Sequence, residues 1–171
     1  MSQGGFLSLR AALRYPDRVS ALILIDSEPG VDPPEVLEGY KGMVGHWTSG
    51  EPLGEVGEMV AGLILGDPGL NAEWIAKWEQ RRAQGGNDME FAAMTLLDRD
   101  DITDRVGEIS VPILSIHGEQ DQSISIDKAV ALQALATDGR GLVRVPDAAH
   151  APNMTHPAIV NAGITDFLNS L

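Results

Sequence analysis

The sequence predicts an α/β fold in which a parallel sheet is covered by helices and interrupted by a helical segment. The first observation is a set of short runs, apolar on both faces, that alternate with helical periodicity near both ends of the chain. Such strands occur in buried parallel sheets. The second is a middle segment that has helical periodicity and no clear strand pattern. We therefore expect core regions at residues 1–30 and 107–171, and a helical insertion at residues 31–106.

The amino-terminal region is expected to contain one helix and one strand. Apolar residues between Phe6 and Leu13 recur at helical spacing, and the helix is expected to end before Pro16. Residues 19–25 form a nearly continuous apolar run of strand length, which ends at the turn signal of residues 26–30. A helix followed by a buried strand is half of a β-α-β unit.

The remaining elements follow from the same two patterns. The middle segment is expected to hold helices over residues 33–46, 53–65, 71–84 and 88–97, separated by Gly and Pro breakers that include the run 84–87. The last region is expected to hold strands at 111–117 and 141–146, and helices at 126–136 and 157–171. Pro157 stands in a first helical turn, where proline is tolerated.

Composition excludes several classes of function. The 171 residues include 12 Lys and Arg, 25 Asp and Glu, and no Cys, with a net charge of −13. Phosphate contacts need clustered Lys and Arg, so we expect no nucleic-acid partner. Without Cys there is no disulfide scaffold, thiol nucleophile or cysteine-ligated metal site. No pair of histidines has metal-ligand spacing with a third ligand, so we predict no metal and no cofactor.

The sequence shows neither the pattern of a membrane span nor that of a signal peptide. No apolar run approaches the roughly 18–20 residues of a membrane span. The first residues have no basic segment followed by an apolar stretch, as a signal peptide would. We therefore expect no membrane partner and a cytoplasmic location.

Three polar residues lie where an α/β sheet places its chemistry, just past the ends of strands. Ser2 stands directly before a helix, Asp121 follows one predicted strand, and His150 follows the next. A serine hydroxyl is a weak nucleophile and needs a base within hydrogen-bond reach. A histidine supplies that base, and a carboxylate orients the histidine.

Four segments around these residues carry a family resemblance. Met1-Ser2-Gln3-Gly4-Gly5 is similar to the nucleophile elbow G-x-S-x-G. Tyr15-Pro16-Asp17-Arg18-Val19, with the apolar run after it, matches the segment that follows the elbow. Residues 112–121 are similar to the strand and turn that bear the acid, and residues 148–153 to the histidine loop. In this order, the segments resemble the α/β-hydrolase family, in its capped esterase, lactonase and haloperoxidase-like branch.

This resemblance implies a serine hydrolase. Ser2 would attack a carboxylic ester, lactone or similar small acyl substrate. His150 would move the proton, Asp121 would orient His150, and the Gln3 backbone N–H would help to hold the oxyanion. The helical segment 31–106 would occupy the place of the cap.

The resemblance begins at the elbow itself. The first glycine of the elbow would fall before Met1, and the strands that precede the elbow in the family have no counterpart in this sequence. The implied fold is an α/β-hydrolase fold that lacks its amino-terminal strands. This leaves an alternative function open, in which a catalytically idle fragment pairs with another chain or with itself through an exposed strand at residues 19–25.

Two assignments stay open at this point. Asp26 follows the earlier strand, where some hydrolases of this class hold their acid; we favour Asp121 because of its Gly118-x-x-Asp121 turn. Trp47, Trp74 and Trp78 either line an apolar acyl pocket or form the inner faces of the helices that carry them. His117 ends a strand, and we interpret it as a packed or loop-capping histidine.

Overall fold

The computed structural model describes residues 1–85 and 89–171, so part of the predicted breaker run 84–87 lies outside the described residues. The amino-terminal elements are α1 (Gln3–Arg14), the 3-10 helix η1 (Pro16–Arg18) and β1 (Leu22–Ile25). The middle helices are α2 (Pro34–Thr48), α3 (Gly54–Ile64), α4 (Pro68–Ala83) and α5 (Met89–Leu97). The remaining elements are η2 (Thr103–Glu108), β2 (Ile113–Gly118), α6 (Ile126–Leu135), β3 (Gly139–Val145), α7 (Pro152–Thr155) and α8 (Pro157–Asn169).

The chain divides into two compact units. The first, here called the sheet unit, comprises Met1–Pro29, Leu63–Leu65 and Ile102–Leu171. The second, here called the helical unit, comprises Gly30–Gly62 and Gly66–Asp101. All three strands and helices α1, α6, α7 and α8 belong to the sheet unit.

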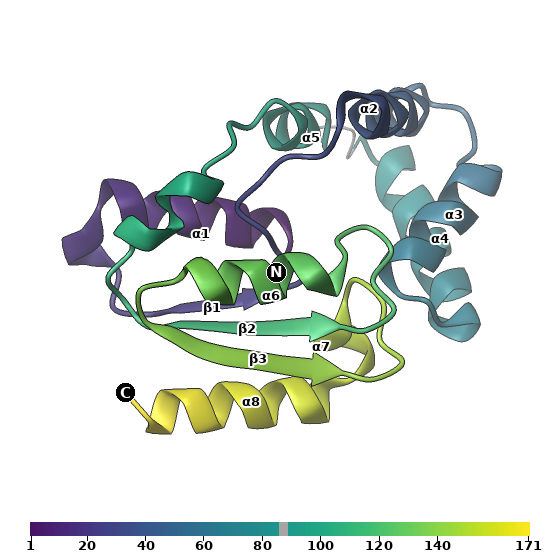
Figure 1. Ribbon diagram of the computed structural model, residues 1–171. Helices are drawn as coiled ribbons and strands as arrows, with labels where there is room; N and C mark the ends of the chain where they lie inside the picture. Colours follow the sequence, from purple (N-terminus) through teal and green to yellow (C-terminus); the bar gives the residue numbers. More distant parts are fainter. Residues whose placement is uncertain (86–88) are drawn as a thin grey trace. The chain divides into compact units, whose positions relative to one another are not determined.

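The sheet of the described residues has three strands, all parallel, in the order β1-β2-β3 (Figure 1). Leu22 of β1 lies opposite Ile113 of β2, and the register shifts between β2 and β3 near Ile113 and Ser115. This confirms the predicted parallel sheet. Because the strands are parallel, their carboxyl ends meet at one edge of the sheet, where the predicted site residues follow them.

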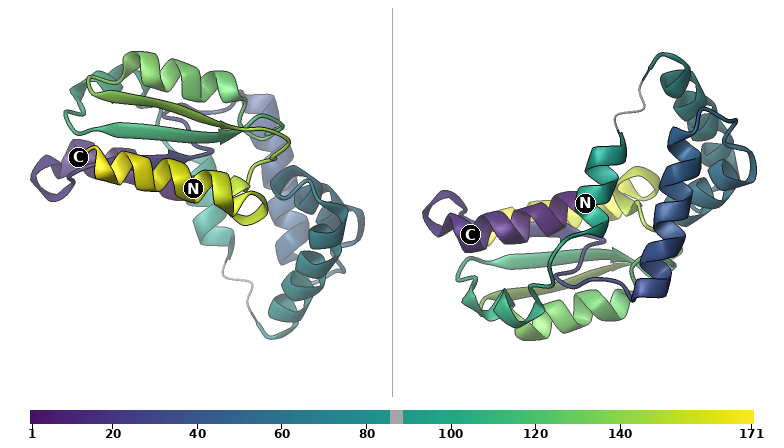
Figure 2. Two further views of the ribbon diagram at one scale, coloured as in Figure 1. Left: turned by 90° about the horizontal axis from the view of Figure 1, so that it is seen from below. Right: turned by 90° about the horizontal axis from the view of Figure 1, so that it is seen from above.

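Helices cover both faces of this sheet (Figures 1 and 2). On one face, residues of α1 and α6 pack with β1 and β2; this cluster contains Leu9, Ala12, Leu22, Leu24, Ile113 and Leu132. On the other face, α8 packs against β2 and β3; this cluster contains Leu114, Ile116, Val145, Val160 and Phe167, with Ile23 and Ile25 of β1 against it. Strand β1 therefore places alternate residues on opposite faces, and both faces are apolar, as a buried strand requires.

The predicted elements were right in type and shifted at their ends. Strand β1 begins at Leu22 rather than at residue 19, because Pro16 starts a 3-10 turn that continues to Arg18. Helix α1 begins at Gln3, directly after Ser2 as expected, whereas β3 begins at Gly139 rather than at residue 141. The short elements η1, η2 and α7 are not predicted, since helices of three to six residues are too short to show a period.

The helical unit is held together around a buried arginine. The Arg82 guanidinium donates hydrogen bonds to the carbonyls of Trp47 (2.9 Å) and Glu51 (2.7 Å), and it pairs with Glu79 at 2.8 Å.

Among the described residues, no helix combines the length and the hydropathy needed to cross a membrane.

Helix α1 and the segment after β1 approach closely at Gly5. A Cβ atom on Gly5 would overlap the Oγ and Cβ atoms of Ser27, which is buried. A Cβ atom on the neighbouring Gly4 would meet nothing within 4 Å. The two adjacent glycines therefore differ in role, and only Gly5 is required for packing.

We predict opposite effects of alanine at these two positions. Gly5→Ala is expected to lower the free energy of unfolding by about 1–3 kcal/mol, because Ser27 must move. Gly4→Ala is expected to leave it unchanged or raise it by up to about 1 kcal/mol, because alanine favours the helix. Urea unfolding followed by circular dichroism measures both. Equal midpoints for the two variants would contradict the packing described here.

Candidate active site

Ser2 lies in a sharp turn at the start of α1. Its backbone has φ 46° and ψ −124°, a conformation with positive φ that residues other than glycine rarely adopt. The Ser2 N–H donates to the carbonyl of Ile25 at 2.9 Å, which places the turn beside the carboxyl end of β1. A strained serine directly before a helix is the geometry of a nucleophile elbow.

Asp121 lies in the turn that follows β2, and its carboxylate is held by backbone donors. Oδ1 accepts hydrogen bonds from the N–H groups of Ser123 (2.8 Å) and Ile124 (3.0 Å). The residue is buried, with 8% of its surface exposed. Its second oxygen, Oδ2, is therefore left to face the histidines of the site.

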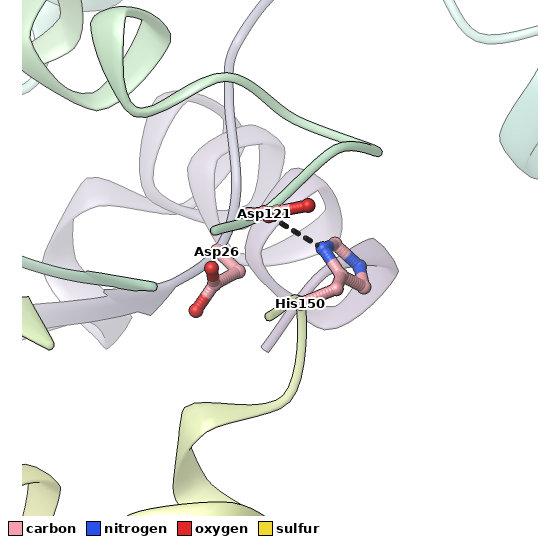
Figure 3. Close-up of side chains that lie close together, drawn as sticks. All are labelled: Asp26, Asp121 and His150. Carbon is pink, nitrogen blue, oxygen red and sulfur yellow. Dashed lines mark hydrogen bonds and ion pairs between the residues drawn. The ribbon is translucent and has the colours of Figure 1, made fainter. Parts of the chain in front are cut away.

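His150 lies in the loop after β3 and contacts Asp121 directly (Figure 3). Its Nδ1 is 2.8 Å from Oδ2 of Asp121, and both residues are buried. A carboxylate oxygen accepts, so we assign the proton to Nδ1, and Nε2 then carries the lone pair. In Figure 3 the second ring nitrogen points away from Asp121. Such a histidine can accept a proton at Nε2.

The turn of Asp121 and the loop of His150 are joined through their backbones. The N–H of Glu119 donates to the Val145 carbonyl at 3.0 Å, and that of Gln120 donates to the Ala148 carbonyl at 2.9 Å. A Cβ atom on Gly118 would overlap the carbonyl oxygens of Ala148 and its neighbour Ala149. Only glycine allows this approach, and the approach brings Asp121 within reach of His150.

Asp26 follows β1 and is fully buried beside this pair. Its Oδ1 accepts a hydrogen bond from the Gly118 N–H at 3.0 Å, and its Oδ2 has no partner among the described residues. Burial raises the pKa of Asp26 to about 8, against the lowering effects of His117 and the Gly118 N–H. Burial thus favours the neutral form of this carboxyl group.

His117, which was interpreted as a packed or loop-capping residue, does cap a loop and also faces the site. Its Nε2 donates to the Ile124 carbonyl at 2.8 Å and lies 3.4 Å from Oδ2 of Asp121. Burial tends to lower the pKa of His117, but Asp121 and Asp26 together raise it above its ordinary value. Burial likewise opposes the charge of Asp121, yet hydrogen bonds from His117 and His150 hold the pKa of that carboxyl well below its usual range.

The contact between His117 and Asp121 was missed at the sequence level. The two residues are four positions apart in the segment that leaves β2, and His117 was judged only by its place at the end of a strand. A signal was available, because the residues between them include Gly118, which allows a tight turn.

The structure brings some predicted site residues together and leaves others apart. Asp121 and His150 are in contact, whereas in the described residues the Ser2 hydroxyl makes no hydrogen bond. Gln3 is the first residue of α1 and adjoins Ser2. Trp47, Trp74 and Trp78 belong to the helical unit, where the ring centroids of Trp47 and Trp78 are 5.3 Å apart and those of Trp74 and Trp78 are 6.3 Å apart.

Asp26, Asp121 and His150 are also the residues that could offer ligands to a cation. One side-chain atom from each lies within 4.8 Å of the others. Asp121 and His150 already form a hydrogen bond with each other, from Nδ1 to Oδ2. A cation bound between those two atoms would have to replace that bond.

Several known proteins resemble the chain in sequence and in structure. Pimeloyl-[acyl-carrier protein] methyl ester esterase of Edwardsiella ictaluri is 28% identical over 175 residues, covering 97% of this chain and 66% of that protein. The solved structure of a thermophilic esterase from Thermogutta terrifontis matches with a TM-score of 0.82 at 26% identity, covering 99% of this chain and 63% of that one. The enol-lactonase from Burkholderia xenovorans LB400 shares the fold, with a TM-score of 0.80 at 22% identity, covering 99% and 64%.

The chain spans just under two thirds of the length of these proteins. The family model described as "Alpha/beta hydrolase family" matches residues 1–162, which include the turn of Ser2, the sheet and the Asp121–His150 pair. Because this match covers nearly the whole chain, the protein belongs to the α/β-hydrolase family.

Proposed function

We propose that the chain carries the Ser-His-Asp triad of a hydrolase that cleaves a carboxylic ester, a lactone or a similar acyl substrate. The observation that carries this proposal is the buried hydrogen bond of 2.8 Å between Nδ1 of His150 and Oδ2 of Asp121. The bond fixes the tautomer of His150 so that Nε2 is the basic nitrogen. The strained backbone of Ser2 at the start of α1 supports the choice of nucleophile.

In the proposed reaction, Ser2 Oγ attacks the acyl carbon while Nε2 of His150 takes the hydroxyl proton. The resulting imidazolium is stabilised by Asp121 and returns its proton to the leaving alkoxide. Water then attacks the acyl-enzyme by the same route, which releases the acid and restores Ser2. The step requires Ser2 Oγ to come within hydrogen-bond reach of His150, and such bonds often form only when substrate is bound.

The oxyanion of the tetrahedral intermediate is proposed to lie at the amino-terminal end of α1. Helix N-termini carry a partial positive charge, and their first N–H groups point away from the helix. The Gln3 N–H is the proposed donor, because Gln3 directly follows the nucleophile and begins this helix. One such donor is typically worth about 10²–10³ in rate.

Asp121 is the proposed acid of the triad, and Asp26 is not. Asp121 is ionised and touches His150, so it can stabilise an imidazolium. Asp26 instead accepts the Gly118 N–H, and its raised pKa of about 8 keeps it mostly neutral at pH 7. A neutral carboxyl group offers little stabilisation to a developing positive charge.

The aromatic cluster of the helical unit is the proposed contact for the acyl chain. Trp47 is buried, and Trp74 and Trp78 are partly exposed, so the cluster presents ring surface at its margin. The curated relative is a methyl ester esterase, which supports an ester as the substrate class for this chain.

A second candidate function rests on the position of β1. In the described residues β1 pairs only with β2, so it lies at the edge of the sheet, and its four residues are all Leu or Ile. An apolar edge strand is a template for pairing with another strand. In this alternative, the chain acts by association and its triad is idle.

Labelling with a fluorophosphonate separates these two candidates. We expect one adduct on Ser2, because the probe reacts with a serine activated by a histidine. Ser2→Ala should abolish the adduct, and His150→Ala should slow its formation by at least about 10³-fold. Intact-mass spectrometry of the 171-residue chain measures both. A chain that is folded by circular dichroism and gains no adduct would favour the idle alternative.

The choice of acid is tested by two asparagine variants. Asp121→Asn is expected to slow labelling by about 10⁴-fold, because His150 loses its partner and adopts the wrong tautomer. Asp26→Asn retains the acceptor for the Gly118 N–H, and we expect it to slow labelling by less than about 10-fold. If the two effects were reversed, the acid would be Asp26.

The charge state of Asp26 is tested by the pH dependence of stability. Its pKa is about 8 in the folded chain, above its ordinary value of 3.8. The folded state therefore binds the Asp26 proton more tightly than the unfolded state does. The contribution of this proton to the free energy of unfolding is fully present below about pH 4 and is lost as the pH rises toward 8. Asp26→Asn stays neutral, and its stability relative to the parent is expected to increase over this window, by on the order of a few kcal/mol.

Urea unfolding at pH 5 and at pH 9 measures this difference. Asp138→Asn is a control, because pairing with Arg140 lowers the pKa of Asp138 and this carboxyl group is charged in the folded and unfolded states at both pH values. Its stability relative to the parent should therefore be the same at pH 5 and at pH 9. An Asp26→Asn variant with no greater advantage at pH 9 than at pH 5 would show that Asp26 is ionised at neutral pH.

A further inference from the structure

His117 places one ring nitrogen among three oxygens. Its Nε2 lies 2.8 Å from the Ile124 carbonyl, 3.4 Å from Oδ2 of Asp121 and 3.6 Å from Oδ1 of Asp26. The residue is fully buried. A carbonyl oxygen can only accept, and Nε2 must therefore carry a proton whether the ring is neutral or charged.

The Asp121 oxygen that faces His117 is the one that binds His150. Oδ2 is 2.8 Å from Nδ1 of His150 and 3.4 Å from Nε2 of His117. The other oxygen, Oδ1, is occupied by the N–H groups of Ser123 and Ile124. The Nδ1–H of His150 is hydrogen-bonded to this oxygen, and Nε2 of His117, whose N–H is hydrogen-bonded to the Ile124 carbonyl, lies near the same oxygen.

The hydrogen bond between His117 and Ile124 also stabilises the turn that carries Asp121. Ile124 accepts from His117 through its carbonyl and donates to Asp121 through its N–H. Because His117 is in β2, this bond ties the turn to the sheet. The position of the Asp121 carboxylate therefore depends on His117 both directly and through Ile124.

We propose that His117 is a positioning residue for the hydrolytic reaction. Its Nε2–H is hydrogen-bonded to the Ile124 carbonyl and lies 3.4 Å from Asp121 Oδ2, and it thereby holds the Asp121 carboxylate in place for His150. This inference rests on the proposed function and adds a residue to that site. His117 does not touch the reacting atoms; it acts through Asp121. Removal of its donor lets the carboxylate move, and His150 then spends less time in the orientation that accepts the serine proton.

The charged groups around His117 explain why a histidine is suited to this position. Asp26, after β1, and Asp121, after β2, both face its Nε2. His150, after β3, contacts Asp121. Two carboxyl groups within 3.6 Å of one N–H favour retention of a proton in this cluster. A shared proton on His117 or Asp26 reduces the repulsion that would otherwise displace Asp121.

Two substitutions at His117 separate the donor from the bulk of the ring. His117→Leu removes the donor, whereas His117→Gln keeps an N–H group near the place of Nε2. For hydrolysis of 4-nitrophenyl acetate, His117→Leu is expected to lower kcat by about 10- to 100-fold with KM unchanged. This is the range typical when a hydrogen-bond partner that orients a functional side chain is removed. His117→Gln should restore most of kcat. His156→Gln, at the start of α8, is the matched control and should behave as the parent.

Proton NMR of histidine-labelled chain gives a second readout that needs no catalysis. The His150 Nδ1–H resonance should lie far downfield in the parent and in His117→Gln, and it should broaden or move upfield in His117→Leu. Near-UV circular dichroism checks that each variant is folded. If His117→Leu lowers the stability too far, the comparison of His117→Gln with the parent by NMR still tests the donor.

Each outcome has a definite meaning. A parental kcat and a parental Nδ1–H resonance in His117→Leu would overturn the proposal. Equal losses in the Leu and Gln variants would also overturn it, because the ring rather than the donor would then matter. If the parent chain neither hydrolyses the ester nor gains a Ser2 adduct, the proposed function fails, and the NMR comparison alone decides whether His117 positions Asp121.

Discussion

The close backbone approach at Gly118 is the constraint on which the candidate site depends. A Cβ atom at this position would overlap the carbonyl oxygens of Ala148 and Ala149, so the turn after β2 and the loop after β3 meet only because residue 118 has no side chain. Two backbone hydrogen bonds, from the N–H groups of Glu119 and Gln120, then hold them. The Asp121–His150 bond is a consequence of this approach, because it spans the same two segments.

The same glycine also connects the segment after β1 to the site. Its N–H donates to Asp26 after β1, so the segments that follow all three strands meet around one residue. This arrangement concentrates two carboxyl groups and two imidazoles in a buried volume. Burial alone would favour neutral carboxyl groups, and the hydrogen bonds decide which of them stays charged. Asp121 accepts hydrogen bonds from two backbone N–H groups and from His150, with His117 nearby, and its pKa is held low. Asp26 accepts one backbone N–H, and burial raises its pKa.

Local sequence patterns were sufficient for much of the fold. The apolar run that contains Leu22–Ile25 and the alternation of strands with helices near the end of the chain predicted a parallel sheet, and the structure has one. These predictions succeed because a buried strand and an amphipathic helix impose periods that can be read over a few residues. The ends of elements were less predictable, since η1 and the register shift near Ser115 depend on neighbouring segments.

The order of Ser2, Asp121 and His150 along the chain, with the glycines beside them, was enough to indicate a hydrolase of the family to which the chain belongs. The sequence by itself thus determined the chemical groups and the strands that carry them. Only the tertiary structure decided that Asp121 rather than Asp26 contacts His150, and that His117 faces the same oxygen. The physical reason is that hydrogen bonding and charge at this site depend on burial and on groups far apart in the chain, such as Asp26 and Gly118, which are separated by 92 positions.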